Sequence, residues 1–541
     1  MTEKRFNLLD EPWLEVVTDA GTIEMVSILD VFRRADQWRG LGQELSTQRF
    51  AILRVLLAFL HRALKGPTLE QWLAAWEAGL PLDEIEAYAT TVRERFWLVH
   101  PTQPFFQTPT LRAAKGPEMG LQKIVADLPD GEQFFTNRSR ADVARLAWEE
   151  AAVWLIHTHA YDTAGIKTGA VDDRLTVNGK GYGYGLPAWC GQVGGLSAQG
   201  RNLRETMLLN LIPTPFEDAD QPAWEREVTT SFRGSVTDEE FTVAGPVQLL
   251  TWQSRRLLIV WDGTEAVGLT LCQGDRITPQ EPPKHFVERM TSWRYSKPQS
   301  AKYGRAIFMP QQHDPTQQAW RGLARLLGSP HGHQAAPSDV KVPDTQLIEW
   351  LTDVQSAEEL DAPPITLEFA GFEYGGQNAT YAEVIDDSLG VPAVVLARNE
   401  QAEAWRALVT TTVSEADSVA YAVRKFAENL AIASGDDRPE LPQWQERTLA
   451  AMDGPIRAWL SGLDHEPDLT AAHRAWQITC RKLALGLGDE LLGTLGPQAF
   501  AGCVPTGESE PITPARAHIW FLRALAKTLP LAAPPTRKEK S

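Results

Sequence analysis

Two pairs of histidines come closest to a spacing that could bind a metal ion. His157 and His159 flank a threonine, and His331 and His333 flank a glycine. Neutral imidazole is a common zinc ligand, and a bound zinc ion can activate water for hydrolysis. The first pair falls in a predicted helix, where residues i and i+2 point about 200° apart. Neither pair has an H-E-x-x-H motif or a carboxylate ladder beside it. A metal-dependent hydrolase therefore stays an alternative, and we expect structural histidines.

Other residue patterns that could do chemistry also lack the required spacing. No G-x-x-x-x-G-K-[ST] motif is present, and the glycine-rich run 179–185 lacks the G-x-G-x-x-G spacing. The segment 195–200 is one residue too long for a G-x-S-x-G nucleophile turn. The four cysteines contain no C-x-x-C pair, which excludes a cysteine-based zinc module. We expect no catalytic residue, no cofactor and no enzymatic activity.

The composition is that of an ordinary globular protein with two or more domains. The chain has 541 residues, of which 43% are hydrophobic and 23% charged. Its first residues run directly into charge, and the most apolar run, 51–60, is far shorter than the roughly 20 residues of a membrane span. We expect a cytoplasmic protein with no membrane partner.

The charge of the chain is uneven along its length. The net charge of −18 argues against a protein that coats nucleic acid by itself, because such binding depends on Lys and Arg displacing counterions. Residues 351–390 contain nine acidic and no basic residues, whereas 284–305 has one acidic residue and six basic ones: Lys284, Arg289, Arg294, Lys297, Lys302 and Arg305. This basic strip fits either a nucleic-acid contact made with partners or a plain solvated face.

The hydrophobic pattern predicts an α+β fold with a large irregular mixed N-terminal domain over 1–382. Strand-like residues flank a turn at 19–21, and a buried helix is expected to begin near Ser46. Further along, a helix is predicted over 140–160, and apolar runs predict strands over 243–250 and 257–261.

Residues 390–541 have a helical pattern and predict an all-α four-helix bundle. Apolar residues recur at i, i+3, i+4 and i+7 before Gly435, which suits a helix C-terminus. A second helix is predicted over 442–460. Asp468 and Thr513 are placed as N-caps of the last two helices, with Pro514 at the first helical position. Short connections between such helices favour an up-down bundle.

Three segments resemble a known family in their order and spacing. They are Phe6–Trp13, Gln103–Thr108 and Arg201–Asn210. The chain resembles CasA, the large subunit of the type I-E CRISPR surveillance complex called Cascade, and the resemblance covers nearly its whole length.

The resemblance implies a non-enzymatic role in antiviral defence. The family's large subunit recognises the PAM, a short motif beside the target, through the minor groove of duplex DNA and starts strand separation. It also provides the docking surface for a helicase-nuclease. The implied partners are therefore the guide RNA, other Cascade subunits, double-stranded target DNA and that helicase-nuclease. Guide pairing reads the sequence, so the protein needs to read only a short flank.

The resemblance also implies a DNA-binding site made of two segments. The family's wedge glutamine, which inserts under the PAM, matches Gln377, with Asn378 and Ala379 beside it. The family's glycine loop, which abuts the minor groove, matches Gly165, Ile166, Lys167, Thr168 and Gly169. Lys167 is expected to add a phosphate contact. An ordinary Gly-Gly-Gln-Asn turn and a simple linker are the alternative interpretations.

Further family elements fall on less distinctive residues. The lysine finger is placed at Lys284, and Lys297, Lys302 and Arg305 are expected to line the DNA path. The loop that docks on the guide RNA and neighbouring subunits is matched to Phe134, Phe135, Asn137 and Arg138. A buried aromatic pair is the alternative for that loop, and a purely structural bridging subunit is the alternative for the whole chain.

Overall fold

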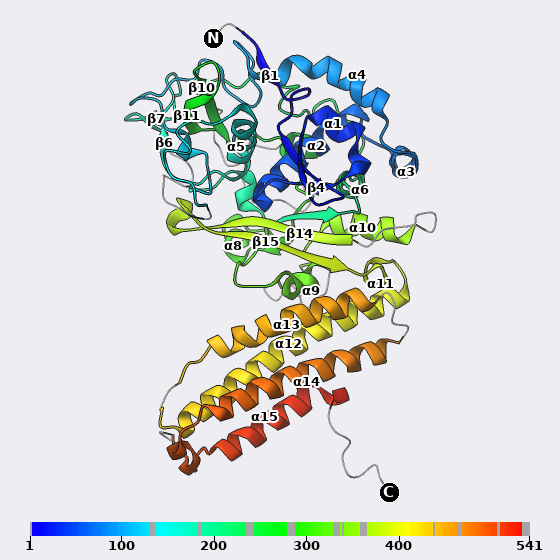
Figure 1. The fold of residues 1–541 in the computed structure, drawn as a ribbon, viewed down its shortest axis with the longest axis vertical. Helices are drawn as coiled ribbons and strands as arrows, with labels where there is room; N and C mark the ends of the chain where they lie inside the picture. The colour runs from blue at the N-terminus through cyan, green and yellow to red at the C-terminus, as the bar shows by residue number, and fades with distance from the viewer. Residues whose placement is uncertain are drawn as a thin grey trace. The chain divides into compact units, whose positions relative to one another are not determined.

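The computed structural model is a mixed helical and stranded chain that divides into two compact units (Figure 1). The N-terminal unit comprises Met1–Gln317, Ala335–Leu351 and Ile365–Ser388, and the C-terminal unit comprises Gln318–Gln334, Thr352–Pro364 and Leu389–Ser541. The structure describes residues 3–128, 134, 136–181, 185–233, 243–275, 277, 287–327, 336–337, 340–357, 365–436, 439–463, 468–505 and 509–532. Strands mixed with helices, followed by long C-terminal helices, confirm the predicted fold class.

Helix α2 (Ser46–Ala63) is the centre of the N-terminal unit. Its side chains are apolar almost all round, and nearly all of them are buried, as the sequence predicted. It contacts α4, α5, α6, α7 and strand β14. The helices around it are α1 Ile28–Arg33, α3 Leu69–Ala78, α4 Leu82–Val92, α5 Trp148–Tyr161, α6 Leu203–Asn210 and α7 Pro246–Leu250.

The strands pair into small sheets in the orders β3-β2-β4, β1-β5, β10-β11-β6-β8-β7, β12-β13 and β15-β14-β9. The β2–β3 pair is the hairpin predicted around residues 19–21. The strands span β1 Arg5–Asn7, β2 Leu14–Thr18, β3 Ile23–Val26, β4 Trp38–Leu41, β5 Trp97–Val99, β6 Lys167–Thr168, β7 Thr176–Val177, β8 Lys180–Gly181, β9 Gly195–Gln199, β10 Arg255–Trp261, β11 Ala266–Gln273, β12 Trp293–Tyr295, β13 Phe308–Pro310, β14 Ile365–Tyr374 and β15 Tyr381–Val391.

Two expectations for the N-terminal unit were wrong in detail. The apolar run 243–250 forms helix α7 instead of a strand, because Pro246 at the first helical position follows Gly245 and favours a helical start. The helix expected over 140–160 begins only at Trp148. The strand expected over 257–261 is present as part of β10.

The C-terminal helices form the up-down bundle that the sequence predicted. They are α12 Glu400–Ala433, α13 Gln443–Gly462, α14 Leu469–Gly493 and α15 Pro514–Thr528. Helix α12 contacts the other three, and α13 packs on α14. Arg447 near the start of α13 pairs with Glu490 near the end of α14, so these two helices are antiparallel. The predicted N-caps Asp468 and Thr513 both accept backbone hydrogen bonds.

The remaining elements are short. The other α-helices are α8 Lys297–Tyr303, α9 Leu323–Leu326, α10 Gln346–Ser356 and α11 Ala393–Leu396. The 3₁₀ turns are η1 Ala35–Gln37, η2 Arg93–Arg95, η3 Leu121–Lys123, η5 Trp189–Gln192, η6 Ala319–Gly322, η8 Gly376–Asn378, η10 Pro497–Ala501 and η11 Pro530–Ala532. Within the described parts of the chain, none of the helices combines the length and apolar character needed to cross a membrane.

A buried ion pair joins α2 to the segment before β12. The Arg54 guanidinium donates to both carboxylate oxygens of Glu288 at 2.9 Å, and both side chains are 2% exposed. Glu288 also accepts from the indole of Trp189 at 2.7 Å and from the backbone of Met290 at 3.1 Å. Burial disfavours the charge of Glu288, but Arg54 and these donors outweigh burial and lower its pKa.

We predict that Glu288→Ala lowers the free energy of unfolding by about 3 to 5 kcal/mol, because it leaves the Arg54 charge buried without its partner. The control is Glu86→Ala, which removes the exposed partner of Arg33 and is expected to cost less than about 1 kcal/mol. Urea unfolding followed by tryptophan fluorescence measures both. Equal losses in the two variants would contradict this account of the buried pair.

Candidate nucleic-acid interface

The two segments predicted to form the DNA site lie in contact. The backbone N–H of Ala164, at the start of the predicted glycine loop, donates to the carbonyl of Asn378 at 2.7 Å. The Asn378 side chain donates to the carbonyl of Gly185 at 3.2 Å. A Cβ placed on Gly165 would lie 3.8 Å from the carbonyl oxygen of Ala379. The structure therefore brings together residues more than 200 positions apart.

Gln377 lies at the tip of the β14–β15 hairpin with its side chain exposed. Gln377 and Asn378 have positive φ values of 57° and 55°, a conformation that Asn adopts more readily than most residues. Hydrogen bonds from Asn378 N–H to Gly375 O at 2.8 Å and from Gly375 N–H to Thr380 O at 2.9 Å close the turn. A Cβ on Gly375 would lie only 2.4 Å from Thr380 Oγ1, so a larger residue there would require the Thr380 side chain to rotate away. The turn is tightly held and presents the Gln377 amide.

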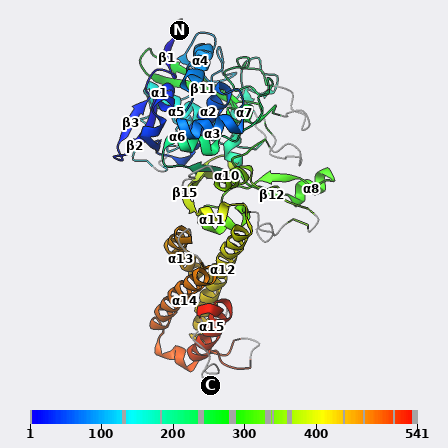
Figure 2. The same cartoon turned by 90° about the vertical axis from the view of Figure 1, so that its right-hand side faces the viewer.

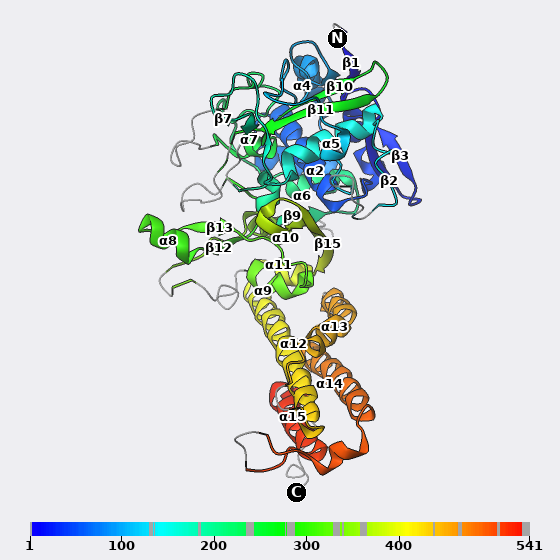
Figure 3. The same ribbon diagram turned by 90° about the vertical axis from the view of Figure 1, so that its left-hand side faces the viewer.

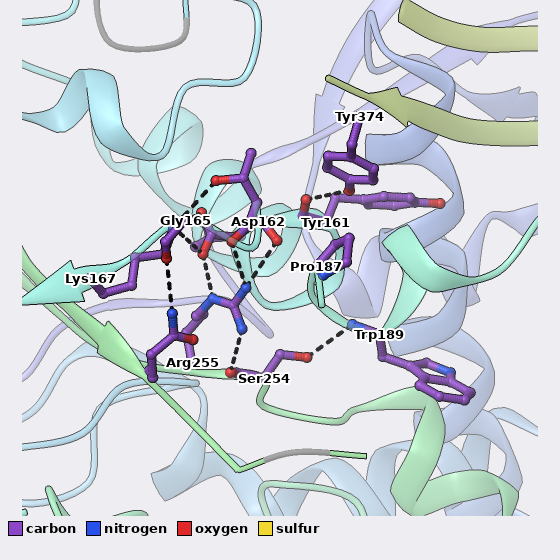
Figure 4. Close-up of polar contacts among 12 residues, drawn as sticks. Tyr161, Asp162, Gly165, Lys167, Pro187, Trp189, Ser254, Arg255 and Tyr374 are labelled. Carbon is purple, nitrogen blue, oxygen red and sulfur yellow. Dashed lines mark hydrogen bonds and ion pairs between the residues drawn. The ribbon is translucent and has the colours of Figure 1, made fainter. Parts of the chain in front are cut away.

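A buried ion pair fixes the backbone under the loop (Figure 4). Arg255 and Asp162 are each 5% exposed, and the Arg255 Nε donates to the Asp162 carboxylate. Arg255 Nη2 also donates to the carbonyls of Asp162 at 3.0 Å and Thr163 at 2.9 Å. The amide of Gln273 donates to the Gly165 carbonyl at 3.0 Å. Three carbonyls of the segment 162–165 are thus held by buried side chains from β10 and β11.

Lys167 belongs to this buried network. Its ammonium lies 2.9 Å from the Asp162 carboxylate, and its side chain is 11% exposed. Burial lowers the pKa of Lys167, although Asp162 opposes that shift. Burial also disfavours the charge of Asp162, but Lys167 and Arg255 outweigh it and lower the carboxyl pKa. The expected phosphate contact of Lys167 is not offered in this arrangement, because its ammonium is largely buried and donates to Asp162 and Thr163.

The other residues of the predicted glycine loop divide into a scaffold part and an exposed part. Thr168 belongs to β6, and its hydroxyl donates to the Lys115 carbonyl at 3.2 Å. A Cβ on Gly169 would lie 2.3 Å from Thr176 Cγ2, so close packing requires glycine there. Ile166 is 60% exposed. Of the residues predicted in these two segments, Ile166, Gln377 and Ala379 are the ones with exposed side chains.

The predicted DNA-path residues lie on a separate basic arm, defined as β12, α8 and β13. Figures 2 and 3 show this arm extending from the rest of the N-terminal unit. Trp293 and Phe308 anchor it in a small core. Residues 293–310 contain no Asp or Glu, and the exposed cations of the arm are Arg294, Lys297, Lys302 and Arg305. The arm is a locally positive surface on an acidic protein.

The predicted docking loop is only partly described. Phe134 is half-buried, and its N–H donates to the Asp127 carbonyl at 3.2 Å. Arg138 pairs with Glu150 at 2.6 Å, and Asn137 is exposed. Phe135 and the predicted lysine finger Lys284 lie outside the described residues, so their roles stay predictions.

The first histidine pair does not form a metal site. His157 Nε2 lies 3.1 Å from Thr47 Oγ1, whereas His159 Nε2 lies 2.7 Å from the Phe106 carbonyl. Burial lowers their pKa values to about 3 and about 4, respectively. Among the described residues, no group of three or more His, Cys, Asp or Glu side chains could hold a metal ion. His331 and His333 lie outside those residues.

Sequence reasoning missed Asp162, Arg255 and Gln273. Arg255 lies 93 positions from Asp162, and Gln273 lies 108 positions from Gly165. The one signal available is a charged or amide residue at the end of an otherwise apolar strand. Arg255 is the first residue of β10, and Gln273 is the last residue of β11. That signal does not identify the partner.

The comparisons with known proteins agree on one family. Residues 7–487 match the family described as CRISPR-associated protein Cse1. The chain is 36% identical to Thermobifida fusca Cse1, whose crystal structure aligns over 98% of this chain and 99% of that one with a TM-score of 0.87. The CRISPR-associated protein CasA/Cse1 of Thermus thermophilus is 30% identical over 273 residues. This alignment covers 49% of the chain and spans about half of the relative, 51% of its length.

A solved structure described as a CRISPR RNA-guided surveillance complex contains a chain of the same fold. Its TM-score is 0.69, at 19% identity over 97% of this chain and 100% of that chain. Together the matches define the class of CRISPR-associated proteins. Within this class, the chain belongs to the Cse1 (CasA) family of large subunits.

We predict that Gln273→Ala increases hydrogen exchange of the amides at 164–167 by about 3- to 10-fold, because it removes the hydrogen bond to the Gly165 carbonyl. Hydrogen exchange followed by mass spectrometry on the full chain measures this change. Gln317→Ala, at an exposed position, is the control and is expected to leave these amides unchanged. Unchanged exchange in Gln273→Ala would show that Gln273 does not hold the loop.

Proposed function

We propose that this chain is the non-catalytic large subunit of a type I-E CRISPR RNA-guided surveillance complex. In this role it recognises the PAM in duplex DNA through the minor groove, starts strand separation and provides a docking surface for a helicase-nuclease. Its partners are then the guide RNA, the other subunits of the complex, the target DNA and that nuclease. The observation that carries the proposal is the contact of the loop at 164–165 with Asn378 and Ala379, the two residues that follow Gln377.

The tip has the properties that minor-groove contact requires. The minor groove offers a small set of acceptors that distinguishes A·T from G·C pairs only coarsely, so a compact amide can read it while tolerating several motifs. Gly165 allows close approach of the backbone, and Ile166 beside it offers an exposed apolar side chain. Minor-groove proteins often press such side chains against a base step and offset the cost of local unstacking through other contacts.

The basic arm supplies the phosphate attraction that the acidic tip segment lacks. Lys297, Lys302 and Arg305 are exposed on the basic arm, whose residues 293–310 include no Asp or Glu. Phosphate contacts position a protein on DNA, whereas contacts to base edges specify the sequence. Lys284 as lysine finger, and Phe134, Phe135, Asn137 and Arg138 as the guide-RNA docking loop, complete the proposal.

We predict that Gln377→Ala reduces discrimination between flanking motifs by about 5- to 100-fold, because one good base contact is worth about 1 to 3 kcal/mol. Binding of duplex targets that differ only in the flanking motif is measured at fixed salt on the reconstituted complex, with and without this chain. Gln37→Ala, at an exposed position in η1, is the control and is expected to retain full discrimination.

The outcomes of that experiment separate the residue from the role. If the chain is needed for discrimination but Gln377→Ala has no effect, the role stands and the placement of the wedge is wrong. If the complex without this chain discriminates equally well, the proposed function is wrong and a purely structural bridging role is favoured.

We predict that the double variant Lys297→Ala, Arg305→Ala weakens DNA binding to a similar degree for every flanking motif. The slope of log K against log salt is expected to fall in magnitude by about 2, since each lost phosphate contact removes about 0.9 from the slope. A salt titration of the same complex measures it, with Arg39→Ala on β4 as an exposed control. An unchanged slope would remove the arm from the DNA path.

A further inference from the structure

A polar cavity of about 300 Å³ lies in the N-terminal unit, away from the residues assigned above. Strand β4, helix α2 and the sheet β15-β14-β9 contribute its walls. Its volume equals that of on the order of ten water molecules and falls at the lower end of small-molecule sites. The polar side chains that carry the following argument are Arg49, Ser197, Glu368 and Asp386.

Glu368 brings a carboxylate into this cavity with few donors around it. It lies directly opposite Ser197 in the β14–β9 register, and the Ser197 hydroxyl donates to it. Burial raises the pKa of Glu368, Arg49 opposes this rise, and Asp386 adds to it. Arg49 is already engaged, because it donates to both oxygens of Asp386 at 3.0 Å and to the Gln43 carbonyl at 3.0 Å. The negative charge of Glu368 is therefore only partly compensated.

Gln43 forms part of the cavity wall and offers the cavity no accessible acceptor. Its side chain is 3% exposed, and its Nε2 donates to the Glu15 carbonyl at 3.3 Å, which fixes the orientation of the amide. Its Oε1 is buried and has no hydrogen-bond partner among the residues that the structure describes. Because this oxygen has almost no accessible surface, a ligand in the cavity cannot reach it, and Gln43 contributes to the shape of the wall only.

The rest of the wall determines which donor fits. Phe50, Leu53 and Leu203 line the same cavity and offer apolar surface to a short alkyl chain. The carboxylates of Glu368 and Asp386 disfavour an anion, and a neutral donor would leave the Glu368 charge uncompensated. Among the described residues, no cluster has enough ligands for a bare metal ion.

We propose that this cavity is a binding site for a small organic cation, an alkylammonium or alkylguanidinium whose N–H groups donate to Glu368. Its methylene groups lie against the apolar wall. The proposal is independent of the proposed DNA-reading function, because it uses neither the loop nor the hairpin tip.

Binding of agmatine to the full-length chain tests the proposal. Agmatine carries a guanidinium and an ammonium on a four-carbon chain, and its neutral and anionic counterparts are 1-butanol and butyrate. At constant ionic strength, agmatine is expected to raise the melting temperature in a saturable way and to bind at a single site by calorimetry. Butanol and butyrate are expected to do neither. This comparison needs no variant, so equal binding of agmatine and butanol overturns the proposal by itself.

Variants then locate the site. Glu368→Gln keeps the shape of the side chain and removes its charge, and it is expected to weaken agmatine binding at least 10-fold. The matched control is Glu373→Gln, an exposed position on the same strand β14, which is expected to bind as the wild type does. Undiminished binding in Glu368→Gln, or a thermal shift that sodium chloride reproduces, overturns the proposal.

Discussion

The buried ion pair between Asp162 and Arg255 is the interaction on which the geometry of the candidate interface depends. Two charges that are 5% exposed are tolerated only when each is paired and hydrogen-bonded. Asp162 is also the C-cap of α5, and Arg255 begins β10, so the pair fixes the end of a helix to the start of a strand. Because Arg255 additionally binds the carbonyls of Asp162 and Thr163, the chain leaves α5 along one path. That path leads directly to Gly165 and Ile166.

The same end of α5 also anchors the hairpin that carries Gln377. The last carbonyls of a helix lack intrahelical partners and need other donors. The Tyr161 carbonyl receives the Tyr374 hydroxyl at 2.6 Å and the Tyr381 hydroxyl at 3.4 Å, one from each strand beside the tip. Burial raises the pKa of both tyrosines, so they remain protonated donors. One helix terminus therefore positions the loop through Asp162 and the hairpin through Tyr161.

The fold was predictable where local sequence determines it, and the interface was not. The N-caps Asp468 and Thr513 and the turn at 19–21 were identified because a cap or a turn is encoded within a few residues. The run 243–250 was predicted as a strand but contains helix α7, because an apolar stretch of that length is compatible with either a strand or a helix. The contact of Asn378 with Gly185 joins residues 193 positions apart, so it cannot be predicted from the local spacing of residues. Gln377 and the glycine loop were placed by family resemblance alone, and the buried role of Lys167 became apparent only from its contact with Asp162.

Under the proposed function, the arrangement separates the holding of DNA from the reading of it. Among the described residues, the hairpin tip presents Gln377 and the neighbouring loop presents Ile166. Residues 351–390 contain no Lys or Arg, whereas Lys115 and Lys180 are exposed beside the loop strand β6. The arm carries further exposed positive charge, because Lys297, Lys302 and Arg305 follow each other within nine residues. Under the proposed function, the arm gives attraction without sequence preference, and the tip gives preference with little attraction. If the tip attracts DNA weakly, a duplex with the wrong flank can dissociate quickly. Only the contacts made by a correct flank add to the affinity that the arm gives to every duplex. The rigid base under the tip then matters more than its charge, because discrimination by shape is lost once the reading groups can move to fit any flank.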